Sequence, residues 1–365
     1  MAKITLEQVN KSFGTFAAVK GVSFTVDHGS FFVILGPSGC GKTTTLRMIA
    51  GLELPTSGRI LLDGEDVTAL LASARDIAFV FQLFALYPHM NVRQNIGFPL
   101  RCQNFSKAEI RKSVEEAAKL LRIDHLLDRR VSGLSGGDRQ RVALGRAIVR
   151  RPKAFLMDEP LGALDSEFRR LMCGELRELH DRIDATSIYI THDQLEAMAM
   201  ADRIAIMNQG RVEQIGSPQE IYDRPKTMFV ADFIGAPPMN FLNVRAALRQ
   251  GDRVVWIDGA RIEMPELFEE RAEGRFVLGV RPESVSFADS SQLRGQVIGA
   301  EYLGTTQIVT VITAGGQVKA RLPSGKSVQV GETVGLKLRA DKLSLFDAAS
   351  GEALSSALDA GARHG

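Results

Sequence analysis

Residues 31–43 read FFVILGPSGCGKT, and this stretch decides the fold. Its first five residues are all apolar, as in a strand that is buried on both faces. The next eight match the phosphate-binding pattern G-x-x-x-x-G-K-[ST] at every fixed position, and an apolar helical pattern follows at once. A strand, a glycine-rich loop and a helix are the context in which this pattern cradles a nucleotide phosphate. The stretch therefore predicts an α/β domain of the P-loop NTPase class.

The residues of this loop have distinct expected roles. Glycines let backbone N–H groups turn toward phosphate oxygens, and the helix N-terminus adds positive potential. Lys42 is expected to reach the β- and γ-phosphates, and the Thr43 hydroxyl to bind Mg²⁺. A chance glycine-rich turn is the alternative, but it does not require the flanking strand and helix. The predicted nucleotide-binding residues of this segment are Gly36, Pro37, Ser38, Gly39, Cys40, Gly41, Lys42, Thr43 and Thr44.

A second buried strand pattern, AFLM at residues 154–157, is followed by Asp158 and Glu159. An acid at the end of a strand is placed to hold Mg²⁺, directly or through water. The next acid is placed to orient or deprotonate an attacking water. A pair of capping acids after a strand is the common alternative, but the phosphate loop in the same chain favours the functional interpretation.

The segment GLSGGDRQR, residues 133–141, opens a helix with residues that weaken helices. Ser135 is expected to cap the helix. Gly136 and Gly137 each lower the stability of the helix by about 1 kcal/mol relative to alanine. They are an advantage only where a ligand must approach the backbone closely. A phosphate at the helix N-terminus is such a ligand. A plain junction between loop and helix explains the serine but not the paired glycines.

Composition and charge argue against several other classes of protein. The chain has 365 residues, 45% of them hydrophobic and 24% charged, with a formal net charge of +2. These values are typical of a globular protein of two domains and indicate no nucleic-acid partner. The 3 cysteines are far apart, which predicts neither disulfides nor a cysteine-based zinc site. No segment is apolar over the roughly 18–20 residues that span a bilayer, so we expect a cytoplasmic chain whose partner supplies any spanning helices.

Alternating buried strands and helical patterns indicate a layered α/β domain up to about residue 235. Residues 3–9 and 22–26 alternate apolar and polar side chains, which predicts half-exposed antiparallel strands. A helix is expected to begin after Ser106, because Glu109 completes a capping box there.

The sequence changes in character after residue 235. Short strand candidates separated by glycine-rich turns predict a small all-β barrel or sandwich. These candidates are residues 276–280, 294–299, 306–313, 317–321 and 334–339. From Ala348 to Gly365 the residues are mostly small or polar, which predicts a frayed C-terminal tail.

The motifs together resemble those of an ATP-binding-cassette (ABC) ATPase, and they occur in the order of that family. LSGG at 134–137 is similar to the family signature. Gln82 in the run VFQ matches the Q-loop, and residues 191–193, THD, resemble the segment of the switch histidine. LGALD at 161–165 resembles the loop after the second acid, and Phe13 stands at the position of the aromatic residue that stacks on adenine.

A narrower resemblance, to the maltose-importer type of ATPase subunit, covers nearly the whole chain. That type serves carbohydrate and glycerol-phosphate uptake. It implies a RecA-like core, an antiparallel β-subdomain and a helical subdomain, followed by an OB-like (TOBE-type) regulatory domain. The segments that carry this resemblance are 84–100, 191–207, 221–242 and 277–285. The implied domains are a nucleotide-binding domain at 1–235, with the helical subdomain and signature helix at about 83–150, and a regulatory domain at 236–365.

The resemblance implies two ATPase subunits that sandwich two ATP molecules head to tail. The residues implied to bind the ATP of the partner subunit are Ser135, Gly136, Gly137 and Asp138. The roles implied around the subunit's own ATP are Mg²⁺ binding by Thr43, Gln82 and Asp158, catalysis by Lys42, Glu159 and His192, and base stacking by Phe13.

The family also implies partners and a location. They are a second ATPase subunit, which makes a homodimer or a heterodimer, two transmembrane permease subunits and, through the complex, an extracytoplasmic solute-binding protein. The chain is then expected at the cytoplasmic face of the membrane, with no nucleic acid bound. Tyr87, Pro88 and Met90 are candidate wall residues of a groove for a permease helix, with ordinary core packing as the alternative.

Two positions depart from the family pattern. Asp138 stands where glutamine is usual, and Gly162-Ala163 stands where this type more often has Ser-Asn. An acid in the first helical turn gains about 0.3–1 kcal/mol from the helix dipole, but it carries negative charge toward the partner's nucleotide. We hypothesise a weakened ATP sandwich, offset by Arg129, Arg139 or Arg141 nearby.

Three other functions compete with sugar import. The first is the same role for another solute, such as a polyamine, sulfate, phosphonate or ferric ion. The second is a cassette ATPase of DNA repair or translation, which tends to have tandem cassettes or long coiled-coil insertions. The third is a small-molecule kinase, which does not need the LSGG segment.

Overall fold

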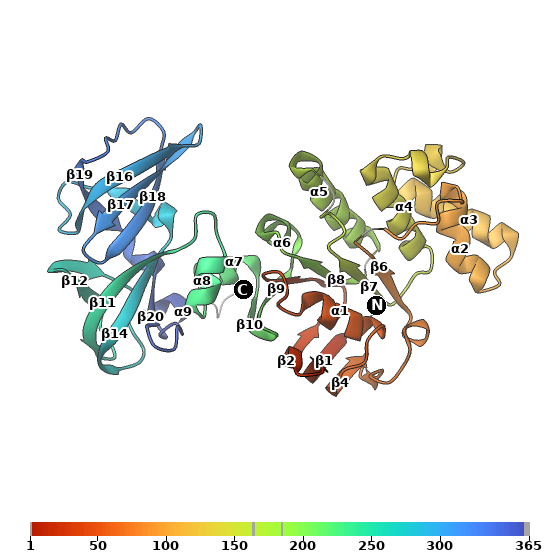
Figure 1. Ribbon diagram of the computed structural model, residues 1–365, viewed down its shortest axis with the longest axis horizontal. Helices are drawn as coiled ribbons and strands as arrows, with labels where there is room; N and C mark the ends of the chain where they lie inside the picture. Colours follow the sequence, from red (N-terminus) through yellow and green to blue (C-terminus); the bar gives the residue numbers. More distant parts are fainter. Residues whose placement is uncertain (1, 83, 163–164, 184, 361–365) are drawn as a thin grey trace. The chain divides into compact units, whose positions relative to one another are not determined.

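The computed structural model describes the chain except for residues 1, 83, 163–164, 184 and 361–365 (Figure 1). The chain divides into two compact units, Met1–Pro218 and Gln219–Gly365. The second unit therefore begins before the domain boundary predicted at residue 235. Its early start has a physical reason, because the buried guanidinium of Arg281 donates to the carbonyl oxygens of Tyr222 and Ala231.

A six-stranded sheet with the order β10-β9-β3-β8-β7-β6 forms the centre of the first unit (Figure 1). Its strands pair in parallel except for β10, which is antiparallel at one edge. Every residue of β3 (Phe31–Leu35), β7 (Ala154–Asp158) and β8 (Thr186–Thr191) is buried, which explains the apolar runs of these strands. The remaining strands are β6 (Ile77–Val80), β9 (Arg203–Asn208) and β10 (Arg211–Gly216).

Three helices follow the central strands. After β3, β7 and β8 come α1 (Lys42–Ala50), α5 (Ser166–Ile183) and α6 (Gln194–Met200). Strand β8 pairs in parallel with both β3 and β7, so the carboxyl ends of the three strands lie at one edge of the sheet. Ligands of open α/β sheets bind at this edge.

An antiparallel sheet with the order β2-β1-β4-β5 completes the core of the first unit. Its strands are β1 (Ile4–Phe13), β2 (Phe16–Val26), β4 (Ser57–Leu62) and β5 (Glu65–Asp66), followed by the 3₁₀ turn η1 (Ala72–Ala74). The strands predicted at residues 3–9 and 22–26 are confirmed. Buried apolar side chains of this sheet, such as Ile4, share one core with Phe32 of β3 and Leu46 of α1.

A helical subdomain lies between strands β6 and β7 in sequence. It contains α2 (Val92–Cys102), α3 (Lys107–Leu120) and α4 (Gly136–Ile148), with the 3₁₀ turns η2 (Asp124–Leu126) and η3 (Val131–Gly133). The predicted capping box is confirmed, since the Ser106 hydroxyl accepts from the Glu109 N–H and the Glu109 carboxylate accepts from the Ser106 N–H. Helices α2 and α4 pack closely, because a Cβ added at Gly145 would lie 3.1 Å from Ile96 Cδ1.

Within its described residues, the second unit contains three antiparallel sheets, as expected for an all-β domain. One sheet is β11 (Asn240–Leu248), β14 (Arg271–Val280) and β20 (Leu343–Asp347). A hairpin is formed by β12 (Val254–Ile257) and β13 (Ala260–Glu263). The five-stranded sheet is β15 (Val285–Phe287), β19 (Thr333–Leu338), β16 (Arg294–Tyr302), β17 (Thr306–Thr313) and β18 (Gly316–Pro323).

Side chains from all three sheets form one hydrophobic core. The strands predicted after residue 235 are all present. The short helical segments are α7 (Pro218–Asp223), α8 (Met228–Phe233), α9 (Ala357–Ala360), η4 (Pro282–Ser284) and η5 (Ala340–Lys342).

The prediction that the chain frays from Ala348 is wrong for residues 348–360. The Leu354 N–H donates to the Leu345 oxygen at 2.7 Å. Its side chain is 5% exposed and belongs to the core of the unit. Backbone hydrogen bonds of Ala353, Ser355 and Ala357 to residues before 270 hold the rest of the segment. Residues 361–365 lie outside the described residues.

Candidate functional site

The phosphate loop is shaped around the ammonium group of Lys42. Its Nζ donates to the backbone oxygens of Gly36 and Pro37, at 2.7 and 2.9 Å. A Cβ at Gly36 would lie 2.2 Å from the Met207 oxygen, so no larger residue fits there. Gly41, with φ of 106°, adopts a conformation that side-chain-bearing residues avoid. The loop therefore holds the Lys42 ammonium against its own backbone carbonyls. A phosphate oxygen can take the place of these carbonyls as the partner of the ammonium.

The other predicted residues of this loop differ in exposure. Ser38 and Gly39 are exposed at its tip, and Thr44 is half-buried in the first turn of α1. Cys40 is buried, and burial raises the pKa of its thiol. A neutral, buried thiol is a packing group, so Cys40 shapes the loop.

Thr43, in the first turn of α1, meets Asp158, the last residue of β7. The Thr43 hydroxyl donates to Asp158 Oδ1 at 3.2 Å. Burial raises the pKa of the Asp158 carboxyl, while this hydrogen bond opposes the shift. A hydroxyl and a carboxylate are the hard oxygen ligands that Mg²⁺ prefers, so the pair fits one side of a magnesium site.

Gln82 lies exposed between strand β6 and the helical subdomain. A Cβ added at Gly162 would lie 3.8 Å from the Gln82 amide nitrogen and 3.9 Å from Glu159 Cβ. Gln82 therefore faces the loop that follows the second acid. Within the described part of the chain, no hydrogen bond joins Gln82 to Thr43 or Asp158.

Glu159 and His192 face each other across the neighbouring strand ends. His192 Nδ1 lies 3.2 Å from Glu159 Oε2, and the ring is 54% exposed against 20% for the carboxylate. The backbone of Glu159 has φ of 44°, and its N–H donates to the Ile190 oxygen at 3.1 Å. A left-handed residue other than glycine costs on the order of 1–3 kcal/mol and is typical of functional positions. In this conformation the carboxylate of Glu159 faces His192.

Phe13 ends strand β1 at a hairpin, where it pairs with Phe16. Both rings are exposed, 49% for Phe13 and 63% for Phe16. The Lys11 ammonium lies 4.9 Å from the centre of the Phe13 ring. An exposed ring on a rigid strand is suited to stacking on a flat base. Sequence reasoning missed Phe16, although it stands only three residues further on.

The signature segment is a separate part of the surface. The Ser135 hydroxyl accepts from the Asp138 N–H at 3.2 Å, which confirms Ser135 as the N-cap of α4. Ser135 Oγ also donates to Asp138 Oδ2 at 2.7 Å. Asp138, the residue at the position where glutamine is usual, therefore forms a hydrogen-bonded ring with Ser135. Within the described residues, no hydrogen bond or ion pair joins 133–138 to the phosphate loop at 36–43.

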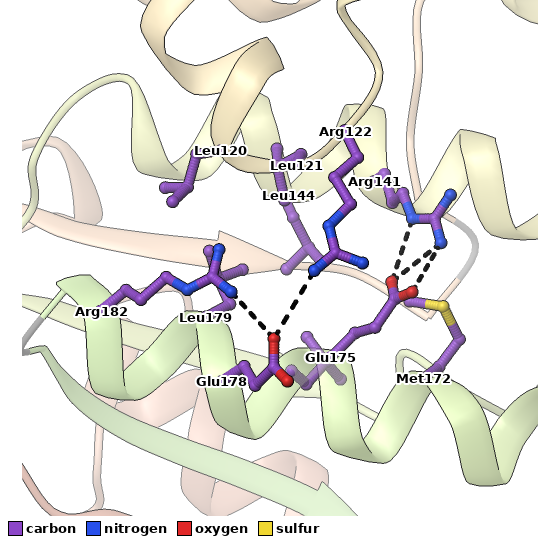
Figure 2. A pocket seen from close by; sticks show the side chains of 11 residues that line it. Leu120, Leu121, Arg122, Arg141, Leu144, Met172, Glu175, Glu178, Leu179 and Arg182 are labelled. Carbon is purple, nitrogen blue, oxygen red and sulfur yellow. Dashed lines mark hydrogen bonds and ion pairs between the residues drawn. The ribbon is translucent and has the colours of Figure 1, made fainter.

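Arg141 is the arginine that balances the charge of Asp138. Their side chains approach to 3.5 Å, and Arg141 also binds both oxygens of Glu175 on α5, at 2.9 and 2.8 Å (Figure 2). Of the three arginines proposed for this role, only Arg141 forms an ion pair with Asp138 among the described residues. The signature helix is thus tied to α5 by a charge network.

A small cavity of about 30 Å³ lies beside this network (Figure 2). Its walls come from the end of α3, from α4 and from α5, and they include Leu121, Leu144 and Leu179. None of the predicted ATP-binding residues lines it. The cavity belongs to the packing between the helical subdomain and the core.

A larger groove of about 520 Å³ lies between strand β6 and helices α2 and α4. Of the three candidate wall residues, Tyr87 lines this groove, whereas Pro88 and Met90 do not. Arg146 of α4 also lines it and donates to the backbone oxygens of Phe84 and Ala85, at 2.8 and 2.7 Å. The apolar walls are completed by Phe79, Phe81, Phe98, Pro99 and Cys102.

The loop LGALD is only partly described. Leu161 is fully buried, and the Asp165 oxygen accepts from the Arg169 N–H at 2.9 Å. Ala163, one of the two departures from the family pattern, lies outside the described residues together with Leu164.

Among the described residues, no helix is both long enough and apolar enough to cross a bilayer.

Two protein families match parts of the chain. The ABC transporter family matches residues 19–162, and the TOBE domain matches residues 278–346. The first match spans the phosphate loop, the signature segment and both acids. The second lies entirely within the all-β unit.

Several proteins are similar over nearly the whole chain. The sulfoquinovosyl glycerol transport ATP-binding protein SmoE of Agrobacterium fabrum is 45% identical over 95% of this chain and 98% of its own length. An sn-glycerol-3-phosphate import ATP-binding protein, UgpC 2, of the same species is 44% identical over 96% and 94%. The trehalose/maltose import ATP-binding protein MalK of Thermococcus litoralis is 45% identical over 97% and 100%.

A solved structure shares the fold of the first unit. A bacterial ABC transporter cassette, solved as a dimer, is 32% identical, with a TM-score of 0.53, over 59% of this chain and 98% of that chain.

Proposed function

This chain belongs to the ATP-binding subunits of ABC transporters, and we propose that it drives the import of a sugar or of a related polyol or glycerol-phosphate compound. It is an ATPase, and ATP is its substrate. The similar proteins act in the transport of sulfoquinovosyl glycerol, glycerol-3-phosphate and trehalose or maltose. The proposal extends that solute class to the present chain. The same role for a polyamine, sulfate, phosphonate or ferric ion is the alternative.

One observation carries the catalytic part of the proposal: the facing pair Glu159 and His192, at 3.2 Å, stands at the same sheet edge as the phosphate loop. In our proposal the Lys42 ammonium leaves the carbonyls of Gly36 and Pro37 to bind the β- and γ-phosphates. Glu159 accepts a proton from the attacking water, and His192 contacts the γ-phosphate. Phe13 stacks on the adenine base.

The magnesium site is also part of the proposal. Thr43, Asp158 and Gln82 would hold the ion through their side-chain oxygens. When bound, Mg²⁺ neutralises charge on the β- and γ-phosphate oxygens. The observed bond between Thr43 and Asp158 keeps the first two ligands within reach of one ion.

The partners follow from the separation of the two phosphate-binding segments. We place the γ-phosphate of a second subunit's ATP at Ser135, Gly136 and Gly137, in a dimer of two such chains. A dimer with a different ATPase subunit is the alternative. Each of two transmembrane permease subunits docks in the groove of one ATPase subunit, lined by Tyr87 and Arg146, and a solute-binding protein acts through the permeases. This arrangement puts the chain at the cytoplasmic face of the membrane, without nucleic acid.

Isolation of the full chain from its own membranes tests this function. We expect two permease subunits and a solute-binding protein to co-purify, and a binding screen on that protein to find a sugar or glycerol-phosphate compound. A stable monomer with full ATPase activity and no membrane partner would contradict the proposal. Binding of a polyamine or an oxyanion instead would leave the ATPase role and change the solute.

A further inference from the structure

Three charged side chains, those of Asp193, Glu196 and Arg169, interact with one another next to the proposed catalytic residue His192. Asp193, which follows His192, accepts from the N–H groups of Leu195 and Glu196 at the start of helix α6. The Asp193 N–H donates to the Thr191 hydroxyl at 2.9 Å. The residues on both sides of His192 are therefore held in place while its own ring is exposed.

Arg169 of helix α5 binds this corner from a distant part of the chain. Its Nη1 donates to Asp193 Oδ2 at 3.1 Å, and its Nε lies 3.6 Å from Glu196 Oε1. Arg169 and Asp193 are each about one quarter exposed, and Glu196 is 5% exposed. The Arg169 guanidinium thus pairs with two carboxylates, those of Asp193 and Glu196. The site is largely shielded from solvent, so these ion pairs are stronger than ion pairs on the surface.

Glu196 anchors the network to the central sheet. The buried Tyr189 hydroxyl of strand β8 donates to Glu196 Oε2 at 2.7 Å. Burial raises the pKa of Tyr189 well above its usual value, so the phenol remains a donor. Glu196 is therefore held by the sheet as well as by Arg169, whereas Asp193 Oδ2 is held by Arg169.

We propose that Arg169 is a positioning residue of the ATPase, which holds His192 opposite Glu159 through its ion pair with Asp193. This inference rests on the proposed function, because it takes His192 as the group that contacts the γ-phosphate. Without the guanidinium, Asp193 Oδ2 loses its ion-pair partner, and the backbone beside His192 is held less firmly. A displacement of about 1 Å at such a site costs up to about a hundredfold in rate.

Helix α5 also offers a matched control. Arg177, two turns further along, donates to Asp202 Oδ1 and to the Met200 oxygen, both at 2.9 Å. This arginine ties α5 to the far end of α6. Its replacement removes a comparable ion pair without touching the His192 corner.

Steady-state kinetics of the full-length protein with MgATP give the first test. We expect Arg169→Gln to lower kcat about tenfold to a hundredfold with KM for ATP nearly unchanged. Arg169→Lys should restore part of the rate, because an ammonium can still pair with Asp193. Arg177→Gln should leave kcat unchanged, and thermal unfolding shows whether each variant is folded. A wild-type kcat in Arg169→Gln would overturn the proposal.

The second test observes His192 itself. The protein contains 6 histidines, and in a sample with ¹⁵N-labelled histidine the His192 ring signals are those lost in His192→Ala. We expect these signals to shift in Arg169→Gln and to stay in place in Arg177→Gln. Unchanged signals would overturn the proposal even if kcat falls. If His192→Ala keeps the wild-type kcat, the proposed catalytic role of His192 is wrong. This variant therefore distinguishes a failure of the proposed function from a failure of the positioning role of Arg169.

Discussion

Glu159 is the single residue on which the hydrolysis step should depend most. We expect Glu159→Gln to lower the ATPase rate by about 10²–10⁴-fold, because an amide cannot accept the proton of the attacking water. ATP binding should persist, since the phosphate loop is untouched. Rate and nucleotide affinity are measured together on the purified protein. Glu167→Gln is the control, since that side chain is exposed in the first turn of α5. A rate within threefold of wild type would show that another group is the base.

Asp138 poses a different question at the same scale. Its carboxylate is engaged by Ser135 and lies 3.5 Å from Arg141, so its charge is partly balanced within the subunit. We still expect Asp138→Gln to strengthen ATP-dependent dimerisation, because a neutral amide removes negative charge facing the partner's nucleotide. Sedimentation with ATP measures the dimer, and Asp128→Asn, at an exposed ion pair with Arg93, is the control. Equal dimerisation and ATPase rates would contradict the hypothesis of a weakened sandwich.

At the scale of the helix, α4 contains an unusual buried group. Gln140 is fully buried, and neither polar atom of its amide has a hydrogen-bond partner among the described residues. A buried polar group without a partner costs about 1–3 kcal/mol. We therefore expect Gln140→Leu, a change of similar volume, to raise the free energy of unfolding of the isolated protein.

Urea unfolding measures that change, with Gln103→Leu at an exposed position as the control. If the stability rises while ATPase activity falls, the amide finds its partner only in the working dimer. A loss of stability on replacement would show that the amide is already satisfied in the single subunit.

The helical elements themselves were largely predictable. Ser106 and Glu109 mark the start of α3 through a capping box, and Ser135 marks the start of α4. These signals are local, because each cap bonds to a backbone group within one turn. The tail was mispredicted because Leu354 gains its stability from packing against distant strands, which no local pattern reveals.

At the scale of the whole molecule, His180 makes stability depend on pH. It is buried, with Nδ1 at 3.0 Å from the Ser187 hydroxyl and Nε2 at 3.1 Å from the Gly29 oxygen. Burial lowers its pKa below the usual 6.5. The unfolded chain then binds the proton more readily than the folded one. The stabilising contribution is present above pH 6.5 and is lost as pH falls through the lower, folded-state pKa.

The two units allow an internal comparison for this effect. The stability measured by circular dichroism should fall as the pH drops below 6.5, and it should fall less in His180→Gln. The single tryptophan, Trp256, lies in the second unit, so its fluorescence transition should lack this contribution. His125→Gln, at an exposed position, should behave as wild type. An identical pH response in His180→Gln would remove His180 as the cause.

The sequence by itself determined the fold class, the phosphate loop, the two acids at the end of β7 and the capped signature helix. Each of these features is written in a contiguous stretch whose chemistry acts locally. Only the tertiary structure decided which charges meet. Arg141 binds Glu175 across 34 positions, and Arg169 reaches Asp193 across 24. Such pairs form because the packing of α5 against α4 and against the start of α6 brings residues far apart in the sequence together. No local pattern in the sequence encodes that packing.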